Sequence, residues 1–289
     1  MDYIIFQVEG GVGKNISATA VVRSINKKYP EHKIVVVTAY PDIWVCNQRV
    51  YKVLQFGQTA YFYTDYIENK NSIILNQEPY RHVDFVYRRR HLVDIWCELC
   101  GVDFDGEQPE LFFTNLELDF VANLLQKSNP IFMIQAFGGA QGQINKYSWA
   151  RDIPPQIAQE VVNIMKKDYR VIQIRREDQI GLEGVESLSL NIRHLILSLL
   201  LSDKRLLIDS MMQHAAAALG KSSTVLWVGN SPTVFGYKIH NNIQSEFLPG
   251  SLKNSMYEPY DIMGDPIQLA TQPNELFKVD QIIKSLTHE

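Results

Sequence analysis

Short apolar runs alternate with segments of helical periodicity along almost the whole chain. Apolar and β-branched runs between turn residues predict strands. These strands lie at residues 3–8, 33–38, 60–64, 85–87, 131–136, 169–174, 185–190, 206–208 and 222–229. Apolar residues spaced three or four positions apart predict helices at residues 16–29, 91–100, 115–127, 154–167, 192–201, 211–219 and 274–286. This alternation is typical of an α/β fold with parallel sheets.

The alternation is interrupted once, near the middle of the chain. The tripeptide at 128–130 is polar and ends in a proline, which disfavours helix in the residue before it. The pattern then repeats, so the sequence predicts two domains, 1–128 and 129–273, followed by a closing helix in 274–289. Open parallel sheets bind ligands at the carboxyl ends of their strands. We therefore expect a ligand in a cleft between the two halves.

The most informative stretch runs from Leu206 to Lys221. A buried strand ends at Ile208, Asp209 and Ser210 have side chains typical of a helix N-cap, and an alanine-rich helix follows. The start of a helix leaves backbone N–H groups unpaired and carries the positive end of the helix dipole, so it is suited to an anion such as phosphate. The alternative is an ordinary buried helix whose alanines favour close packing.

A glycine-rich turn follows the first predicted strand. The sequence EGGVGKN resembles a variant phosphate-binding loop, with Lys14 to reach a phosphate. Asn15 stands where such loops place the hydroxyl group that holds magnesium. An ATPase that uses Gly10 to Lys14 is therefore kept as an alternative. A tight turn that simply needs glycine is another.

Composition narrows the setting of the protein. The chain has 289 residues, of which 46% are hydrophobic, enough for a large core. It has no apolar run long enough to span a bilayer and no signal-peptide pattern at the start. Three cysteines do not make a disulfide framework, so we expect a cytoplasmic protein, with peripheral membrane contact left open. The net charge of −4 argues against a protein that coats nucleic acid, although a local basic face is compatible with it.

Two local patterns allow more than one interpretation. The basic run RRRH at residues 88–91 is either solvated surface or a site for an anionic acceptor or a phosphate backbone. Cys97 and Cys100 lie one turn apart on a predicted helix. A single pair of this kind is weak support for a metal site, and half-buried helix cysteines are the commoner explanation.

The order of these motifs resembles the heptosyltransferase-like glycosyltransferases, the ADP-heptose-dependent enzymes that build the lipopolysaccharide core. In the best-matching stretch, 187–237, DSMMQHAAAALGK is similar to the family's Asp-Ser/Thr followed by His-x-Ala-Ala-Ala-Leu-Gly-Lys. VLWVGNSPTVFGY resembles the strand and Gly-x-Ser/Thr-Pro segment that follows. The opening unit with Gly13, the helix HLVDIWCELCGV, and Lys146 and Trp149 after a glycine turn also resemble the family. The resemblance implies a GT-B fold, in which two Rossmann-like domains with parallel sheets face each other across a cleft.

The resemblance also implies a set of donor-binding residues in the second half. They are Gly138, Gly139, Lys146, Glu177, Asp209, Ser210, Met211, Met212 and His214. Backbone N–H groups at 210–212 would bind the diphosphate, Lys146 would pair with a phosphate, and Glu177 would accept hydrogen bonds from a ribose. The family commonly has glycine where Met211 stands. His214 could instead be a core histidine, and Glu177 could be an exposed surface residue.

The catalytic base is where the chain departs from the family. The family's catalytic Asp corresponds to Lys14, and a lysine cannot act as a base unless its pKa is strongly lowered. Lys14 is better suited to meet an anion. We expect the base to be Glu9, or failing that Asp42 or Asp65, each near a predicted strand end.

The sequence therefore predicts a metal-independent, inverting glycosyltransferase that needs no cofactor beyond its donor. It would move a sugar from a nucleotide-diphosphate donor to an acceptor hydroxyl. The acceptor would be a surface glycan of the lipopolysaccharide type or a hydroxymethylated base of viral DNA. The alternatives are the ATPase described above and a catalytically inactive GT-B binding protein.

Overall fold

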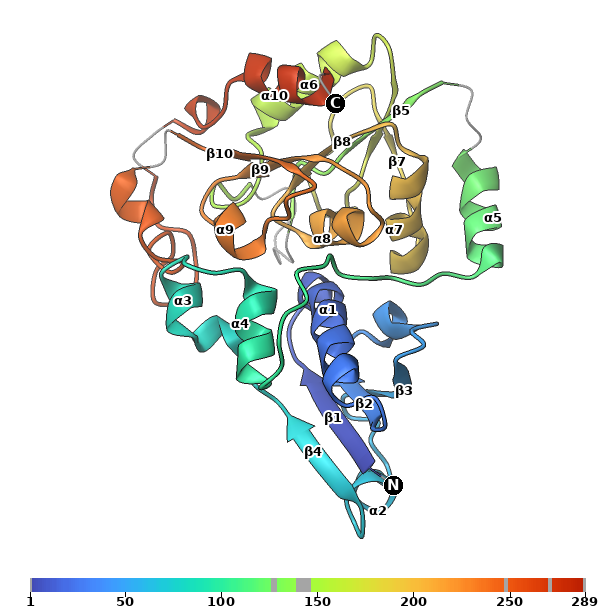
Figure 1. Cartoon of the computed structure of the whole chain (residues 1–289). Helices are drawn as coiled ribbons and strands as arrows, with labels where there is room; N and C mark the ends of the chain where they lie inside the picture. Colours follow the sequence, from blue (N-terminus) through green and yellow to red (C-terminus); the bar gives the residue numbers. More distant parts are fainter. Residues whose placement is uncertain (1, 126–128, 139–146, 247–248, 270–271, 288–289) are drawn as a thin grey trace.

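The computed structural model describes residues 2–125, 129–138, 147–246, 249–269 and 272–287. It contains two fully parallel sheets, each the centre of one lobe (Figure 1). The sheet of the first lobe has four strands, in the order β3 (Val50–Gln55), β2 (Lys33–Thr38), β1 (Asp2–Val8) and β4 (Asn71–Leu75). The sheet of the second lobe has six, in the order β10 (Asn241–Gln244), β9 (Thr224–Trp227), β8 (Lys204–Ile208), β5 (Ile131–Ile134), β6 (Arg170–Gln173) and β7 (Glu186–Ser187).

Both strand orders reverse direction at one point. In the first lobe the chain builds β1, β2 and β3 to one side and then places β4 on the other side of β1. In the second lobe it builds β5, β6 and β7, then returns to place β8 on the other side of β5. Ligands of open α/β sheets bind beside such reversals, at the carboxyl ends of the strands. The fold therefore marks two places for a ligand, one after β1 and β4 and one after β5 and β8.

Helices cover the sheets (Figure 1). In the first lobe these are α1 (Val12–Lys28), the short α2 (Phe62–Tyr66) and α3 (Val83–Val86), and α4 (Leu92–Leu99). In the second lobe α6 (Pro155–Met165) and α10 (Val279–Thr287) pack together on the outer face of the sheet. Helices α7 (Ile192–Leu201) and α8 (Met211–Ala218) lie on the face toward the first lobe. Helix α9 (Pro232–Phe235) is a single turn. Helix α5 (Asn115–Leu125) packs against α7, so this segment lies beside the second lobe.

One hydrophobic core passes through both lobes. It joins Phe6 and Trp96 of the first lobe to Leu207 and Trp227 of the second through the helices between the sheets. The α/β organisation with two parallel sheets, predicted from the alternation of apolar runs and helical segments, is confirmed.

Some local predictions were wrong. Residues 60–64 overlap helix α2, because Tyr61 has a left-handed backbone, with φ of 60°, that ends extended structure. Residues 85–87 overlap α3, whose first turn is capped by the Nδ1 atom of His82, which accepts a hydrogen bond from the N–H of Asp84. Strands β3, β4 and β10 were not predicted from the sequence. These strands lie at sheet edges and carry many exposed polar residues, so their apolar pattern is weak.

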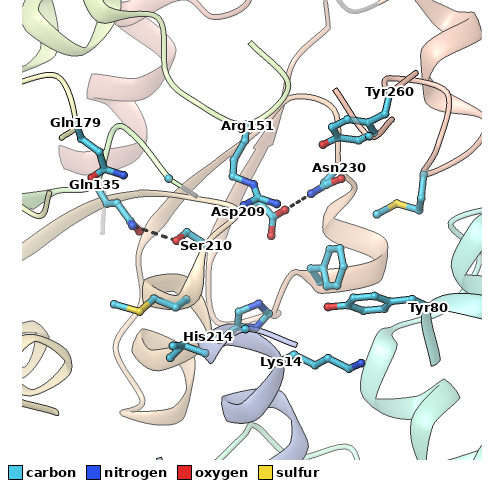
Figure 2. A pocket seen from close by; sticks show the side chains of 18 of the residues that line it. Lys14, Tyr80, Gln135, Arg151, Gln179, Asp209, Ser210, His214, Asn230 and Tyr260 are labelled. Atoms are coloured by element: carbon cyan, nitrogen blue, oxygen red, sulfur yellow. Dashed lines mark hydrogen bonds between the residues drawn. The ribbon is translucent and has the colours of Figure 1, made fainter. Parts of the chain in front are cut away.

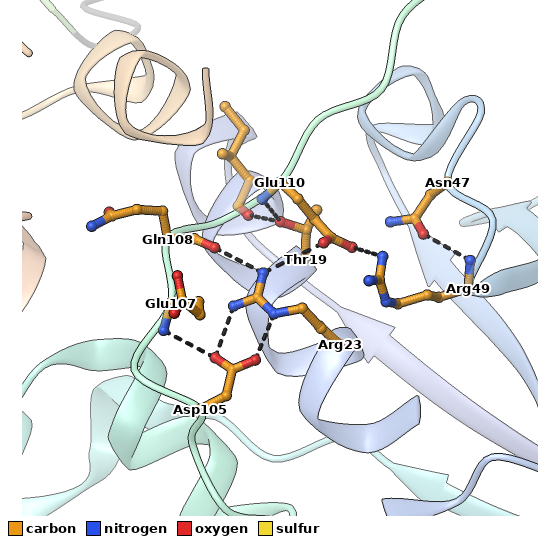
Figure 3. A network of polar contacts seen from close by, with 9 residues as sticks. Thr19, Arg23, Asn47, Arg49, Asp105, Glu107, Gln108 and Glu110 are labelled. Carbon is orange, nitrogen blue, oxygen red and sulfur yellow. Dashed lines mark hydrogen bonds and ion pairs between the residues drawn. The ribbon is translucent and has the colours of Figure 1, made fainter. Parts of the chain in front are cut away.

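An ionic network fixes the chain segment that leads from the first lobe to the second (Figure 3). Arg23 of α1 donates from Nε and Nη2 to the carboxylate of Asp105, at 2.6 and 2.8 Å, and from Nη1 to the carbonyl of Gln108. Arg49, just before β3, pairs with Glu110 at 2.6 Å. We call residues 105–110 the crossing segment. It is held against the first lobe by several charge-assisted hydrogen bonds.

Arg193 of α7 fastens the second lobe to the same region. Its guanidinium donates to both carboxylate oxygens of Glu117, at 2.5 and 3.0 Å, and to the carbonyls of Asp42 and Phe112, each at 2.8 Å. Asp42 belongs to a short 3-10 turn, η1 (Pro41–Trp44), in the first lobe. The side chain of Arg193 is only 9% exposed, so this cation connects three separate segments in a largely dry environment.

Candidate functional site

A cavity of about 1130 Å³ lies between the two sheets, at the carboxyl ends of their strands (Figure 2). Its walls include both strand-order reversals. The first lobe contributes Gly11 to Lys14, which follow β1, and Tyr80, which follows β4. The second lobe contributes Gln135 and Gly138 after β5, together with the residues after β8. The cleft between the halves that the strand pattern predicted is present.

Helix α8 begins at the cavity without a capping side chain. Strand β8 ends at Ile208, and Asp209, Ser210 and Met211 line the cavity. Ser210 is the N-cap residue, but among the described residues no side chain caps the helix. The Oγ atom of Ser210 instead accepts a hydrogen bond from Gln135 Nε2 at 3.0 Å. The first N–H groups of α8 are therefore left to water or a ligand at the positive end of the helix dipole.

Helix α1 begins at the opposite wall of the same cavity. Gly11 is its N-cap residue, again without a side-chain cap in the described part of the chain. Gly13 brings α1 close to α8, because a Cβ atom at this position would lie 2.9 Å from His214 Cδ2. Two helix starts, one from each lobe, thus converge on one cavity, and both favour negative charge there.

Arg151 adds a cation between these helix starts. It lines the cavity near Asp209, and Figure 2 shows its side chain directed toward that carboxylate. Its Nε atom is buried and has no hydrogen-bond partner among the described residues. Gly138 lets the side chain pass, since a Cβ atom there would lie 3.2 Å from Arg151 Cδ. A buried guanidinium N–H without a partner is costly, so the arrangement favours an anionic ligand at this point.

Asp152 holds the loop from which Arg151 projects. Its two carboxylate oxygens accept hydrogen bonds from the N–H groups of Gly138, at 2.9 Å, and Ser148, at 3.0 Å. The residue is fully buried, and burial raises the pKa of its carboxyl group to about 6 although both hydrogen bonds and Arg151 lower it. The sequence analysis missed Arg151 and Asp152. The signal that was present is their position two and three residues after Trp149, in the segment that resembles the glycosyltransferase family.

Lys14 faces the cavity but is already paired. Its Nζ atom lies 2.6 Å from Glu78 Oε2, and 4.6 and 5.2 Å from the ring centroids of Tyr80 and Trp96. Glu78 is also fixed from the other side, because its Oε1 atom accepts a hydrogen bond from the N–H of Tyr80 at 3.1 Å. The carboxylate that the first lobe brings to the position of Lys14 is thus Glu78, which the sequence analysis did not identify.

His214 is engaged inside the protein through both ring nitrogens. Nδ1 lies 2.8 Å from the hydroxyl of Tyr237 and 3.2 Å from that of Ser17, and Nε2 lies 3.1 Å from Gln213 Nε2. Burial lowers the pKa of His214 to about 3, with smaller contributions from His91, His240 and Arg151. A neutral imidazole with both nitrogens occupied connects the lobes, and only the rest of its ring faces the cavity.

The other predicted site residues are dispersed. Asp209, Ser210, Met211 and Gly138 line the cavity with Lys14 and His214, whereas Met212 points into the core. Four carboxylates are exposed and lie outside the cavity lining: Glu9 beside Gln7, Asp42 in η1, Asp65 in α2, and Glu177 in the turn after β6. Gly139 and Lys146 lie outside the described residues.

The turn after β1 does not have the shape of a phosphate-binding loop. Only Glu9, Gly10 and Gly11 separate β1 from α1. The side chain of Asn15 points inward, where its Oδ1 atom accepts hydrogen bonds from Thr38 and Trp44. With Lys14 held by Glu78, the turn lacks the long cradle of N–H groups and the mobile lysine that such loops use.

The basic run at residues 88–91 is used inside the protein. Arg88 has a left-handed backbone and donates from Nη2 to the carbonyls of Gly229, Leu252 and Ser255 in the second lobe, at 2.7 to 3.1 Å. Arg90 pairs with Asp84, Asp94 and Glu98. The run is therefore neither fully solvated nor a free basic patch.

Two further patterns have plain outcomes. Cys97 and Cys100 are buried, and burial raises the pKa of each thiol to about 12. Within the described ranges, no three His, Cys, Asp or Glu side chains gather in a way that could hold a metal ion. The helices of the same ranges are too short or too polar to cross a bilayer.

Comparison with solved structures identifies the fold. The glycosyltransferase family 9 protein of Veillonella parvula matches with a TM-score of 0.70, 12% identity, and coverage of 98% of this chain and 95% of that chain. ADP-heptose lipopolysaccharide heptosyltransferase II of E. coli matches with a TM-score of 0.65, 13% identity, and 98% coverage of both chains. E. coli heptosyltransferase WaaC, solved with ADP-2-deoxy-2-fluoro heptose, gives 0.58, 12% identity, and coverage of 98% and 99%.

In sequence, no protein-family model and no curated protein matches the chain. The structural likeness extends over nearly the whole chain, and it confirms the predicted GT-B fold.

Proposed function

We propose that the protein is a glycosyltransferase that moves a sugar from a nucleotide-diphosphate donor to an acceptor hydroxyl. The observation that carries the proposal is the uncapped start of α8 at the strand-order reversal of the second sheet, with Arg151 beside it. Main-chain N–H groups, a helix dipole and a guanidinium together suit a pyrophosphate. The GT-B fold, shared with WaaC solved with ADP-2-deoxy-2-fluoro heptose, supports a nucleotide-sugar donor for this protein.

The donor would lie along the second lobe. Its pyrophosphate would bind the N–H groups at 210–212 and Arg151, and the start of α1 would face the same charge from the other lobe. The nucleoside would extend toward the end of β6, where Ile174, Arg175 and Gln179 line the cavity. Lys146, Gly139 and Glu177 remain predicted donor contacts. In this arrangement His214 supports the two lobes, because its nitrogens are occupied.

The reaction would be a single displacement with inversion. The acceptor oxygen forms a bond to the anomeric carbon, the bond from that carbon to the β-phosphate oxygen breaks, and the nucleoside diphosphate leaves with the electron pair. Arg151 and the helix starts stabilise the charge that develops on the leaving phosphate, which lets the residues described here act without a metal ion. The acceptor proton passes to a base.

We assign the base to Glu78. Glu9, Asp42 and Asp65 are exposed and lie away from the cavity lining. Glu78 is not part of the lining either, but it touches Lys14, which is. An acceptor hydroxyl bound beside Lys14 is then within one side chain of a carboxylate that the N–H of Tyr80 holds in place.

A pair of charge insertions tests the donor site. Ser210→Asp places a carboxylate at the start of α8, where it should stabilise the helix yet repel a pyrophosphate. We expect the variant to keep or raise its melting temperature and to lose at least tenfold in affinity for nucleoside diphosphates, measured by calorimetry across a panel of bases. Asn191→Asp makes the same kind of change at the start of α7, where Asn191 is the cap, and should leave affinity unchanged.

Activity measurements separate the rival functions. An ATPase would hydrolyse ATP with magnesium and lose that activity in Lys14→Ala. A catalytically inactive binding protein would bind the donor but release no nucleoside diphosphate with any acceptor. If Ser210→Asp and Asn191→Asp bind nucleotides as the unchanged protein does, the donor site is not at α8 and the proposal is wrong.

A further inference from the structure

Two tyrosine side chains turn their hydroxyl groups into the cavity. Tyr80 follows β4 in the first lobe, and Tyr260 comes from the segment after β10 in the second; both line the cavity and are half-buried. Figure 2 shows the two rings entering from the same side, with their hydroxyls directed inward. Neither hydroxyl makes a hydrogen bond within the described part of the chain. Both are therefore open to a ligand.

The ring of Tyr80 is fixed before a ligand binds. It stacks on Phe85, with ring centroids 4.7 Å apart, and meets Phe235 edge-on at 6.1 Å. The Nζ atom of Lys14 lies over its face, 4.6 Å from the centroid, and its N–H donates to Glu78 at 3.1 Å. A ring held in this way loses little freedom when its hydroxyl binds a ligand.

Tyr260 is fixed relative to Arg151. It forms an isolated β-bridge with Pro266, and the carbonyl of the next residue, Ile267, accepts a hydrogen bond from Trp149 Nε1 at 2.8 Å. Trp149 and Arg151 belong to the same turn, which is two residues long between them. The turn that carries the guanidinium and the segment that carries the phenol are thus joined directly.

Both phenols lie within electrostatic reach of Arg151 and Asp209. Burial is the main cause that raises the pKa of Tyr80; Asp209 and Glu78 raise it further and Arg151 lowers it. Burial also raises the pKa of Tyr260, with Arg151 opposing and Asp209 adding to the shift. Each hydroxyl therefore keeps its proton and can donate one hydrogen bond beside the proposed donor site.

Hydrogen-bond donors without partners gather at this place. The two phenols join the Nε atom of Arg151 and the uncapped N–H groups of α8. The acidic side chain among them, Asp209, already accepts a hydrogen bond from Asn230. A phosphate group only accepts hydrogen bonds, so it suits such a set of donors better than a sugar hydroxyl, which also has to donate.

The direction of the tyrosines selects one end of a pyrophosphate. Figure 2 shows Gln135 and Gln179 on one side of Ser210 and the two tyrosines on the other. The nucleoside of the proposed donor extends toward Gln179. The phosphate that faces the tyrosines is then the one farther from the nucleoside, which is the β-phosphate.

We infer that the hydroxyls of Tyr80 and Tyr260 donate hydrogen bonds to the β-phosphate of the donor, so that both lobes hold the leaving group. The inference rests on the proposed function and adds two residues to its donor site. As the bond from the anomeric carbon to the β-phosphate oxygen breaks, negative charge grows on that phosphate and both hydrogen bonds strengthen. The phenols keep their protons throughout.

Calorimetry with Tyr80→Phe and Tyr260→Phe tests the inference, because phenylalanine keeps the ring and removes only the hydroxyl. The probes are ADP, GDP, UDP and CDP, together with the matching monophosphates. We expect each variant to bind the preferred diphosphate at least about fivefold more weakly and its monophosphate within about twofold of the unchanged protein. Tyr63→Phe is the control, since Tyr63 is 70% exposed on α2, outside the cavity lining.

Three results would overturn the inference. The first is a well-folded variant that binds the diphosphate as Tyr63→Phe does. The second is an equal loss for the monophosphate and the diphosphate, which a general disturbance of the site would produce. The third is a loss seen only with the nucleotide sugar, which would assign the hydroxyls to the sugar. If Tyr80→Phe folds poorly, Tyr260→Phe decides alone.

The charge insertion at α8 reports separately on the proposed function. If Ser210→Asp abolishes diphosphate binding while both phenylalanine variants bind normally, the donor site stands and the inference about the tyrosines fails. If no nucleotide binds the unchanged protein, the proposed function fails and the inference falls with it.

Discussion

The histidines between the lobes make the protein sensitive to acid. His214 is buried with Tyr237, and the ring centroids of His91 and His240 lie 5.3 and 6.0 Å from that of Tyr237. Burial lowers the pKa of His214 to about 3 and those of His91 and His240 to about 4. In the unfolded chain a histidine has a pKa of about 6.5. The folded protein therefore excludes protons that the unfolded chain takes up.

The sign and size of the effect follow from linkage. The stability that comes from keeping these histidines neutral is fully present above pH 6.5. It is lost as the pH falls toward 4, at about 1.4 kcal/mol per histidine and pH unit. At pH 5 the three histidines together lower the free energy of unfolding by about 6 kcal/mol. Asp152 acts in the opposite direction, because its carboxyl, with a pKa of about 6, binds a proton in the folded state first, which restores about 1 kcal/mol. We expect a net loss of about 4 to 5 kcal/mol between pH 7 and pH 5, a large part of the usual stability of a protein.

Urea unfolding at a series of pH values measures this loss. His240 donates from Nε2 to the carbonyl of Gln213 at 2.9 Å, a hydrogen bond that the amide of His240→Gln can also make. The variant should therefore lose about 2 kcal/mol of the difference between pH 5 and pH 8. The comparison at pH 8, where both proteins are neutral at this position, gives the packing cost and serves as the control. The reasoning is refuted if unfolding free energies at pH 5 and pH 7 agree within about 1 kcal/mol.

The remaining predictions concern the lobe contacts and the base. Arg193→Ala should lower the free energy of unfolding by about 3–5 kcal/mol, because Glu117 and two carbonyls lose their partner, whereas Arg176→Ala, at an exposed pair with Asp178, should cost under about 1 kcal/mol in the same urea titration. Gly13→Ala should cost about 1–3 kcal/mol, since its new methyl group would meet His214; Gly11→Ala, with nothing within 4 Å, is the matched control in calorimetric unfolding. Glu78→Gln should lower kcat at least about 100-fold with the donor KM little changed, and the exposed Glu9→Gln should not. Equal kcat values for these two variants would remove Glu78 from the role of base.

The sequence predicted the parts of this protein in which local and global preferences agree. The start of α8 was found because a strand, cap-type residues and an alanine-rich helix follow one another directly in 206–219, and the structure places its beginning at the cavity. The paired sheets were found for the same reason. Edge strands such as β3 were missed because half of their side chains face water.

The contacts of Lys14 and Arg151 in the cavity could not be predicted from sequence spacing. Glu78 meets Lys14 only because β4 lies next to β1, although 64 positions separate the two residues. Arg151 lies in a turn without a recognisable motif. Its direction toward the cavity depends on Gly138, which leaves room for the side chain, and on Asp152, which fixes the turn. Strand-end carboxylates such as Asp65 were plausible on the chain, but the fold places that helix away from the cavity.

The ion pairs that Arg23 and Arg49 make with the crossing segment have a consequence for how the two lobes can move. A GT-B protein with a slack connector could swing its halves widely apart to exchange ligands. Here the connector is pinned to the first lobe, and α1 and α8 touch at Gly13, so any large rotation has to separate these helices and break the buried hydrogen bond between Ser17 and His214. Entry and exit are then best served by the mouth of the cavity, where the turn with the fully exposed Ile262 can rearrange without separating the lobes.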